Sequence, residues 1–309
     1  MTFTSEISLF DSEDSKKNII IYNDNIIELL NELLNVNDLN MIKQSLNELK
    51  NSDNKEMLNN YQNFHNDIEQ ILDTYTIERS KYYLKRLLKS FTEVKTNNLN
   101  DLDLNKWKQY EDIITDSLWI LEKRDNSGAH NANYWGNFIP QIPNQLFRRY
   151  TKQGDWVLDT FLGSGTSLIE CKRLGRNGIG IELQDNVVKI AEHNIENESN
   201  PFDVRTKIIN GDSTQIDYST ILENLGINKF QFIIMHPPYW DIIKFSEDKN
   251  DLSNSDNIQE FLQKIGLIID NTYPFLEKGR FLALVIGDKY SNSEWIPLGF
   301  YCMQEIMKR

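Results

Sequence analysis

The chain has 309 residues, a formal net charge of -13, 39% hydrophobic side chains and 11% aromatic ones. This composition excludes a disordered chain, and the length suits one large domain or two smaller ones. There is no run of 18 apolar residues and no N-terminal signal pattern, so we expect neither a membrane span nor secretion. Two cysteines, Cys171 and Cys302, argue against a disulfide scaffold or a zinc ribbon and favour a cytoplasmic location. The acidic charge predicts weak non-specific binding of nucleic acid.

The first part of the chain has the pattern of a helical domain. Residues 1–130 contain one glycine, Gly128, and no proline. Apolar residues recur at three- and four-residue spacing, which predicts amphipathic helices over 26–34, 39–50 and 56–72, with further helices over 76–94 and 106–123. We therefore predict an all-helical domain over residues 1–128.

One of these helices has two interpretations. The run 79–95 carries six basic side chains and one acidic one, with Tyr82, Tyr83 and Phe91 between them. Such a surface is suited to a phosphate backbone. The same run is equally typical of a helix whose leucines pack inward while its lysines are solvated.

The second part of the chain alternates short β-rich runs with helical patterns. Strands are predicted at 156–159, 178–182, 204–209, 230–235 and 281–287, and helices at 166–175, 185–197, 216–225, 257–272 and 297–308. Alternation at this spacing predicts a parallel sheet with helices on both faces. The predicted fold class is α/β, with a doubly wound sheet over residues 129–309 that follows the helical domain.

A glycine-containing turn follows the first predicted strand. The strand ends at Asp159, Gly163 and Gly165 lie in the turn, and a helix begins near Thr166. Glycine lets the backbone turn tightly and approach a ligand closely, and open α/β sheets bind ligands at the carboxyl ends of their strands. A tight strand–helix connection without any ligand gives the same local pattern.

Acidic residues mark the ends of the next two predicted strands. Glu182 is placed to accept hydrogen bonds from two ribose hydroxyls, and Asp212, in the segment 210–213, to meet an adenine amino group. Leu168 stands where a dinucleotide fingerprint has its third glycine, and no Gly-Lys-Ser/Thr sequence is present to hold phosphates. Together these features predict a nucleoside ligand without phosphates.

The fourth predicted strand runs directly into His236-Pro237-Pro238-Tyr239-Trp240. The two prolines stiffen this loop and remove two backbone donors, so that carbonyl groups are left to accept hydrogen bonds. The aromatic pair after them offers a stacking surface. A rigid loop with buried aromatic side chains is the alternative interpretation.

Taken together, these segments resemble the S-adenosylmethionine-dependent amino-methyltransferases of DNA, which modify adenine N6 or cytosine N4. Residues 159–170, DTFLGSGTSLIE, are similar to the cofactor motif of that family. The loop 236–239 stands where the family carries Asp, Asn or Ser followed by Pro-Pro-Tyr. Residues 133–151, which include Pro140, are similar to the helix that closes over the methionine end of the cofactor. The resemblance covers approximately residues 130–290.

The resemblance implies S-adenosyl-L-methionine as the cofactor and assigns it a set of residues: Asp159, Phe161, Gly163, Gly165, Thr166, Glu182, Asp212, Ser213 and Pro140. His236, Pro237, Pro238 and Tyr239 would form the catalytic loop. Hydrogen bonds from the target amine to the Pro237 carbonyl and to His236 would draw its nitrogen toward tetrahedral geometry. Tyr239 would stack on a base flipped out of the duplex. No metal site is expected, because no His/Cys cluster has ligand spacing.

Histidine at position 236 departs from the family pattern. A neutral imidazole accepts one hydrogen bond, whereas its protonated form accepts none, so activity would fall below pH ~6.5 unless the pKa is shifted. The departure also leaves adenine and cytosine open as targets. Methylation of cytosine C5 is disfavoured, because no Pro-Cys pair occurs.

The function implied by the resemblance is site-specific methylation of an exocyclic base amine in DNA, in restriction–modification or phage defence. The alternatives are an RNA or protein-glutamine methyltransferase and a non-catalytic, cofactor-binding subunit. Sheets of this family normally add a strand pair after the strand at 281–287, whereas only one helix pattern follows here. Either the chain is truncated, or another chain (a partner subunit or a second copy) or the N-terminal domain completes the sheet and reads the DNA. With the acidic charge, this predicts that something besides this domain supplies much of the DNA binding.

Overall fold

The computed structural model describes residues 25–51 and 62–309 of the chain. The chain divides into two compact units. The first contains the described residues up to Asn97 together with Leu102–Ile113, and the second contains Asn98–Asp101 and Ile114–Arg309. The second unit therefore begins earlier than residue 129, the start predicted from the sequence. Among the described residues, no helix has both the length and the apolar character needed to cross a membrane.

The first unit consists of helices: one over residues 25–35, then α2 (Leu39–Asn51), α4 (Gln62–Leu72), α5 (Ile77–Thr92) and the 3-10 helix η2 (Leu104–Gln109). Their buried sides form one core, which includes Leu30, Ile42, Leu46, Ile68 and Leu84. The helices predicted at 26–34, 39–50 and 76–94 are confirmed. The helix predicted at 56–72 is confirmed from Gln62 onward, and residues 56–61 lie outside the described ranges.

Helix α5 contains most of the basic run 79–95. Its N-terminus is capped by Thr76, whose side chain accepts the N–H of Arg79 at 3.2 Å. Leu84 and Leu87 are buried, and Leu88 and Phe91 pack against the same core. The inward packing predicted for this helix is confirmed, and binding of a phosphate backbone by its basic residues stays a prediction.

The helix predicted over 106–123 is wrong beyond Gln109, where the chain continues in turns and bends. The N–H of Ile114 donates to Gln145 Oε1 at 2.8 Å, and the carbonyl of Ile114 accepts from Arg149 at 3.1 Å. Because these side chains take backbone groups that a helix would pair internally, tertiary partners replace the helical ones here.

The second unit is built on a five-stranded sheet with the order β3-β2-β1-β4-β5. The strands are β1 (Trp156–Asp159), β2 (Asn177–Glu182), β3 (Thr206–Asn210), β4 (Phe230–Met235) and β5 (Leu276–Leu284). Every neighbouring pair is parallel. The strand order reverses between β1 and β4, and the crevice at such a switch point is where open α/β sheets bind ligands.

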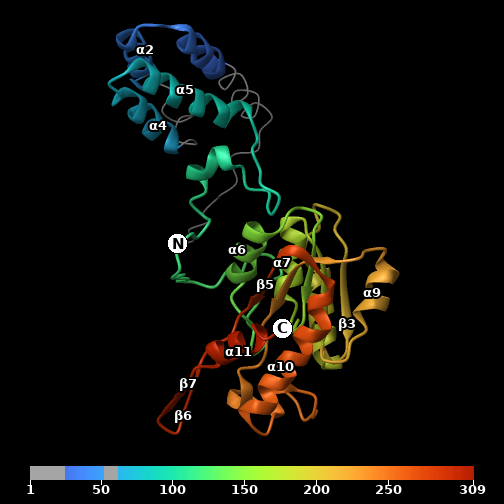
Figure 1. Cartoon of the computed structure of the whole chain (residues 1–309). Coiled ribbons are helices and arrows are strands. Elements are labelled where there is room, and N and C mark those ends of the chain that lie inside the picture. The colour runs from blue at the N-terminus through green and yellow to red at the C-terminus, as the bar shows by residue number, and fades with distance from the viewer. Residues whose placement is uncertain (1–24, 52–61) are drawn as a thin grey trace, which may run out of the picture. The chain divides into compact units, whose positions relative to one another are not determined.

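Helices cover both faces of this sheet (Figure 1). They are α6 (Gln141–Tyr150), α7 (Thr166–Leu174), α8 (Asp185–Glu196), α9 (Tyr218–Leu225), α10 (Ile258–Thr272) and α11 (Leu298–Ile306). Successive residues of β1 point to opposite faces. Val157 packs in a core with α6, α7 and α8, and Leu158 in a core with α9, α10 and α11. The predicted α/β class, with a doubly wound, Rossmann-like sheet after helices, is confirmed.

A short hairpin separates the sheet from α11 and extends from the second unit beside that helix (Figure 1). Its strands, β6 (Lys289–Ser291) and β7 (Glu294–Ile296), are antiparallel and form a sheet of their own. Asn292 and Ser293 between them have φ values of 51° and 63°, as two-residue hairpin turns require. The sequence predicts only a helix here, because strands of three residues are too short to show alternation.

Three single-turn 3-10 helices complete the second unit: η3 (Trp240–Ile242), η4 (Leu252–Asn254) and η5 (Tyr273–Phe275). The first two lie in the connection between β4 and α10, and the third joins α10 to β5.

Candidate functional site

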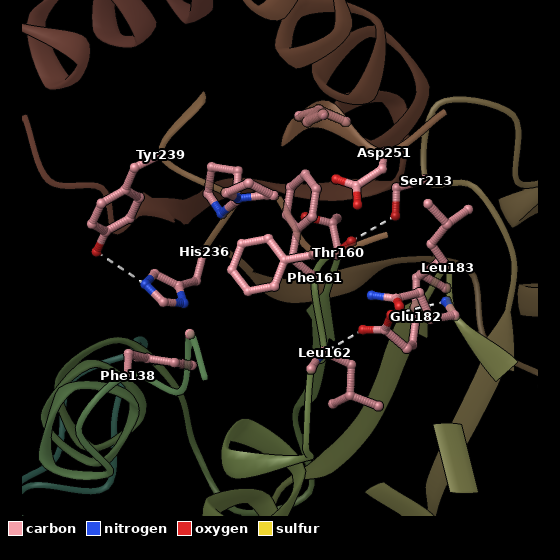
Figure 2. Close-up of a pocket in the computed structure, with 18 of the residues that line it drawn as sticks. Phe138, Thr160, Phe161, Leu162, Glu182, Leu183, Ser213, His236, Tyr239 and Asp251 are labelled. Carbon is pink, nitrogen blue, oxygen red and sulfur yellow. Dashed lines mark hydrogen bonds between the residues drawn. The ribbon is translucent and has the colours of Figure 1, made fainter. Parts of the chain in front are cut away.

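A cavity of about 420 Å³ lies at the carboxyl ends of four parallel strands. Its lining includes residues 160–163 after β1, 182–184 at the end of β2, 211–213 after β3 and 236–239 after β4. Figure 2 shows His236 and Tyr239 on one side of this cavity and Glu182 on the other. Parallel strands bring their carboxyl ends to one edge of the sheet, so four segments separated in sequence meet there.

The turn after β1 places Phe161 and Gly163 in the cavity wall. Gly165 lies behind them and begins α7 with a φ of 98°. A Cβ atom on Gly165 would lie 2.9 Å from Ile195 Cδ1, so this position requires glycine both for its backbone angle and for its space.

Four of the predicted cofactor residues do not line the cavity and instead surround the turn: Asp159, Gly165, Thr166 and Pro140. Asp159 accepts the N–H of Phe161 at 2.9 Å and a hydrogen bond from the Ser167 hydroxyl. Burial raises the pKa of Asp159 to about 6, because its effect is larger than that of the two hydrogen bonds, which lower the pKa. Thr166 donates to Asn137 at 3.4 Å, and Pro140 is the buried residue before α6.

Glu182 joins the end of β2 to the turn after β1. One carboxylate oxygen accepts the N–H of Gly163 and the other that of Gln184, both at 2.9 Å. Burial raises the pKa of Glu182, with a smaller contribution from the carboxylates of Asp159 and Asp251, while the two backbone donors lower it. Each oxygen retains a second lone pair, so the carboxylate can accept two further hydrogen bonds from a ligand diol.

Asp212 and Ser213 line the cavity from the loop after β3. Asp212 Oδ1 accepts both the N–H and the hydroxyl of Thr214, at 2.9 and 2.8 Å, and Oδ2 accepts from Gln215 at 3.0 Å. Ser213 donates its hydroxyl to the carbonyl of Thr160 at 2.6 Å. The carboxylate of Asp212 thus holds its own loop, and Ser213 ties that loop to the end of β1.

All four residues of the predicted catalytic loop line the cavity: His236, Pro237, Pro238 and Tyr239. A hydrogen bond of 3.1 Å joins His236 Nε2 to the hydroxyl of Tyr239, and the imidazole packs against the ring of Phe138 at a centroid distance of 4.6 Å. Burial lowers the pKa of His236 to about 4. The imidazole is therefore neutral at pH 7, with one donor and one acceptor nitrogen. In the tautomer whose Nε2–H donates to the Tyr239 hydroxyl, Nδ1 is the acceptor that is left for a ligand.

The proline carbonyls remain available as acceptors. Within the described residues, no hydrogen bond ends on the carbonyl oxygen of Pro237. Because Pro238 has no N–H, this stretch of the loop presents an acceptor without a competing donor beside it. An amine with two hydrogens is complementary to a neutral imidazole nitrogen and a carbonyl oxygen, and the residues that carry them line the same cavity.

Several of the residues that line the cavity were not identified by the sequence analysis. Tyr134, Asn137 and Phe138 precede α6 and line the cavity. Burial raises the pKa of Tyr134, and the carboxylates of Glu182 and Asp251 raise it further. The family resemblance points to the segment 133–151 that contains these residues, but no local pattern distinguishes the ones that face the cavity.

Asp251 is a buried acid of the cavity wall that the sequence analysis missed. It lies in a polar connection between β4 and α10, where Oδ1 accepts the N–H and hydroxyl of Ser253 at 2.8 and 2.7 Å, and Oδ2 accepts from Ser246 at 2.8 Å. An Asp-x-Ser sequence favours such a turn, but nothing local separates Asp251 from the exposed acids beside it.

A second group of buried polar residues lies outside this cavity. His130 Nε2 and Glu170 Oε1 are 2.6 Å apart, with both side chains 1% exposed. Arg173 lies 3.3 Å from Asp125 and 3.6 Å from Glu170. The single guanidinium lies between these two carboxylates, so the group is organised as an ion-pair network around α7.

A protein-family model matches this chain, and several known proteins are similar to it over part of their length. A model described as DNA methylase matches residues 8–193. The type II methyltransferase M.MjaII of Methanocaldococcus jannaschii is 34% identical over 122 residues, which cover 37% of this chain and 23% of that protein. The type II methyltransferase M2.DpnII of Streptococcus pneumoniae is 38% identical over 102 residues, which cover 31% of this chain and 34% of that protein.

The structure of TrmN from Thermus thermophilus aligns with a TM-score of 0.35 and 18% identity, over 48% of this chain and 38% of that one. The chain spans only 23% and 34% of the lengths of the two curated relatives. The matched residues 8–193 contain the glycine turn and Glu182 but end before Asp212 and the loop 236–239.

Proposed function

Because the chain belongs to the DNA methylase family, whose model covers more than half of it, we propose that it is a site-specific DNA methyltransferase. It transfers a methyl group from S-adenosyl-L-methionine to an exocyclic base amine, cytosine N4 or adenine N6, in restriction–modification or phage defence. The observation that carries this proposal is the cavity at the strand ends, which is lined both by the acids Glu182 and Asp212 and by the loop His236–Tyr239.

The lining of the cavity fits this cofactor. Three acids, Glu182, Asp212 and Asp251, line it, and among the described residues no Lys or Arg does. Such a lining attracts a cation and repels phosphates. The volume of about 420 Å³ lies within the range of small-molecule sites. S-adenosyl-L-methionine, a sulfonium nucleoside without phosphates, supplies an electrophilic methyl group when bound there.

Individual residues then have defined tasks. Glu182 accepts the ribose hydroxyls, and Asp212 and Ser213 shape the loop that faces the adenine. Phe161 and Gly163 border the methionine part, while Asp159, Gly165, Thr166 and Pro140 hold the turn and the helix around it. The cavity lining supports only the distinction between lining and supporting residues, and the assignment to ribose, adenine and methionine follows the family resemblance.

The loop after β4 acts on the target base. The neutral imidazole of His236 and the carbonyl of Pro237 accept the two amine hydrogens, Pro238 keeps the loop stiff, and Tyr239 stacks on the extruded base. These two hydrogen-bond acceptors favour tetrahedral geometry at the amine nitrogen, in which the lone pair of the nitrogen is free to attack the methyl group. The increase in rate therefore comes from positioning and electrostatics.

The proposal extends to assembly and location. Among the described strands, β3 pairs only with β2 and β5 only with β4, so both edges of the sheet are open, including the β5 edge. A chain with a net charge of -13 repels a phosphate backbone over much of its surface. A partner subunit or a second copy that completes the sheet and helps to read the target accounts for both features. Two buried, free cysteines agree with a cytoplasmic location.

The test is methyl transfer from tritiated S-adenosyl-L-methionine to separate DNA, RNA and protein acceptors. We expect label in DNA, with mass spectrometry of the nucleosides showing N4-methylcytosine or N6-methyladenine. Tyr239→Ala should reduce the label strongly, whereas Tyr75→Ala, at a position 94% exposed in the first unit, should not. Label that enters RNA or protein instead of DNA, or that is unaffected by Tyr239→Ala, contradicts the proposal.

A further inference from the structure

We propose that Lys289 is a positioning residue, which holds the catalytic loop in its working conformation from the hairpin β6–β7. The inference rests on the function proposed above for the loop His236–Tyr239, because it assigns to Lys289 the task of fixing that loop. Lys289 lies 50 residues beyond Tyr239 in the sequence and does not line the cavity.

Trp240, directly after the loop, has an unusual backbone conformation. Its φ is 53°, in the left-handed region that residues with a Cβ rarely adopt. The indole N–H donates to the carbonyl of Ser255 at 3.1 Å, which fixes one side of the ring. A strained residue at the end of a functional loop keeps its conformation only when its surroundings determine it.

Lys289 supplies the second set of contacts. Its Nζ lies 4.2 Å from the centroid of the Trp240 ring and forms an ion pair with Asp241 Oδ1. The Lys289 side chain is only 12% exposed, so its ammonium is partly shielded from water, although Asp241 is 46% exposed. Cation–π contacts and ion pairs are stronger in such surroundings than on an open surface. One side chain therefore holds two consecutive residues that follow Tyr239.

The hairpin is itself held firmly at its base. Asp288 accepts the N–H of Gly299 at 3.2 Å with one oxygen and the indole N–H of Trp295 at 3.1 Å with the other. Just before it, Gly287 packs against Tyr239, since a Cβ there would lie 2.7 Å from Tyr239 Cε2. The segment 287–289 thus contacts Tyr239 through its glycine and Trp240 through its lysine.

Through these contacts, the position of Tyr239 depends on the positive charge of Lys289 in β6. Without the ammonium, Trp240 loses a contact on its ring, and Asp241 loses its partner. The loop can then relax from its left-handed turn and carry Tyr239 away from the place where a base must stack. Misplacement of about 1 Å lowers reaction rates by about 100-fold in enzymes that depend on positioning.

The experiment compares full-length wild type with Lys289→Met, which keeps the aliphatic chain, and Lys289→Arg, which keeps the cation. Lys278→Met, on the exposed part of β5, is the matched control. Two quantities are measured: the single-turnover rate of methyl transfer to DNA, and hydrogen exchange of the backbone over residues 236–243. Calorimetry with S-adenosylhomocysteine monitors the cofactor site.

We expect Lys289→Met to transfer methyl about 10- to 100-fold more slowly, with cofactor affinity unchanged within about twofold. Exchange of residues 236–243 should be faster than in wild type. Lys289→Arg should restore both quantities, and Lys278→Met should change neither. Asp241→Asn, at an exposed partner, should loosen the loop in the same direction and serves as the second variant if Lys289→Met does not fold.

The proposal is overturned if Lys289→Met matches Lys278→Met in exchange and rate, or if the arginine variant is as impaired as the methionine one. Hydrogen exchange needs no methyl transfer. Faster exchange in Lys289→Met, combined with a wild type that does not methylate DNA, would therefore count against the proposed function and still support the positioning role.

Discussion

The Nε2 atom of His236 lies 3.1 Å from the hydroxyl oxygen of Tyr239, so the first and last residues of the Pro-Pro loop share a hydrogen bond. Phe138 packs on the other side of the imidazole. This enclosure explains how a histidine can stand where the resembling family carries Asp, Asn or Ser. Burial of much of the imidazole disfavours its charged form and lowers its pKa, so the ring is neutral at pH 7.

The pH dependence of methyl transfer is the first prediction. Because burial lowers the pKa of His236 to about 4, this residue should cause no loss of rate between pH 8 and about pH 5.5. Protonation at lower pH removes the acceptor, and the rate should fall there. Single-turnover rates against pH test this. A decline centred near the ordinary histidine pKa of about 6.5 that is absent in His236→Asn would contradict it.

The same shift has a consequence for stability. The unfolded chain binds a proton at this histidine near pH 6.5, whereas the native state does so only near pH 4. Between these values the unfolded state holds more protons, so the contribution of His236 to stability decreases as the pH falls through this window. Denaturant unfolding of wild type and His236→Asn at pH 7.5 and pH 5 should show the larger decrease in wild type.

Removal of the carboxylate of Glu182 is expected to weaken cofactor binding. Glu182→Ala takes away both the proposed ribose acceptor and the partners of the Gly163 and Gln184 N–H groups. We expect the affinity for S-adenosylhomocysteine to fall at least tenfold, about 1.4 kcal/mol, by calorimetry. Glu192→Ala, at an exposed position on α8, should bind like wild type. Equal affinities of Glu182→Ala and wild type for S-adenosylhomocysteine would mean that Glu182 does not bind the cofactor.

Asp212→Ala should weaken the same binding by a different route. The carboxylate of Asp212 holds Thr214 and Gln215, so its loss loosens the loop that faces the proposed adenine position. Asp212→Asn retains one carbonyl oxygen as an acceptor and should recover part of the affinity. Calorimetry with S-adenosylhomocysteine that shows no loss in Asp212→Ala would mean that the loop does not contact the cofactor.

Gly165→Ala tests the turn between β1 and α7. The φ of 98° disfavours any Cβ, and this Cβ would also lie 2.9 Å from Ile195 Cδ1. We expect the free energy of unfolding to fall by about 1–3 kcal/mol in urea denaturation. Gly154→Ala has a similar positive φ of 84° but nothing within 4 Å of the new Cβ, so it should show the smaller loss. Equal losses would mean that the contact with Ile195 has no energetic effect.

The buried pair of His130 and Glu170 should contribute to stability. His130→Ala leaves Glu170, whose side chain is 1% exposed, with Asn144 and Arg173 as its remaining partners. We expect a loss of about 1–3 kcal/mol in the free energy of unfolding. The double variant His130→Ala/Glu170→Gln should lose less than the sum of the single variants, because the two substitutions remove one shared interaction. Additive losses would show that the pair is not coupled.

Local sequence determined much of this protein. The strands β1, β2 and β4 and the helices that follow them appear as runs and periodicities of 4 to 15 residues, because burial of one face imposes a pattern on neighbouring positions. The glycine turn and the His236–Tyr239 loop also appear as short segments. Parallel strands have their carboxyl ends at one edge of the sheet. The glycine turn after β1 and the His236–Tyr239 loop after β4 could therefore be expected to lie close together from the sequence alone.

Only the tertiary structure decided which predicted residues line the cavity and which support it. Gly163 faces the cavity, while Gly165, two positions later, packs against Ile195. Asp251 and Lys289 belong to polar segments without a pattern. The burial of Asp251 in the cavity wall and the pairing of Lys289 with Asp241 therefore depend on contacts that local sequence does not show. Residues 110–123 do not form the predicted helix, and within them the backbone N–H and carbonyl of Ile114 pair with Gln145 and Arg149 of α6 instead of with a helical neighbour. The periodicity of a segment predicts which of its faces is buried. The neighbours of each buried side chain are determined by tertiary contacts with other segments.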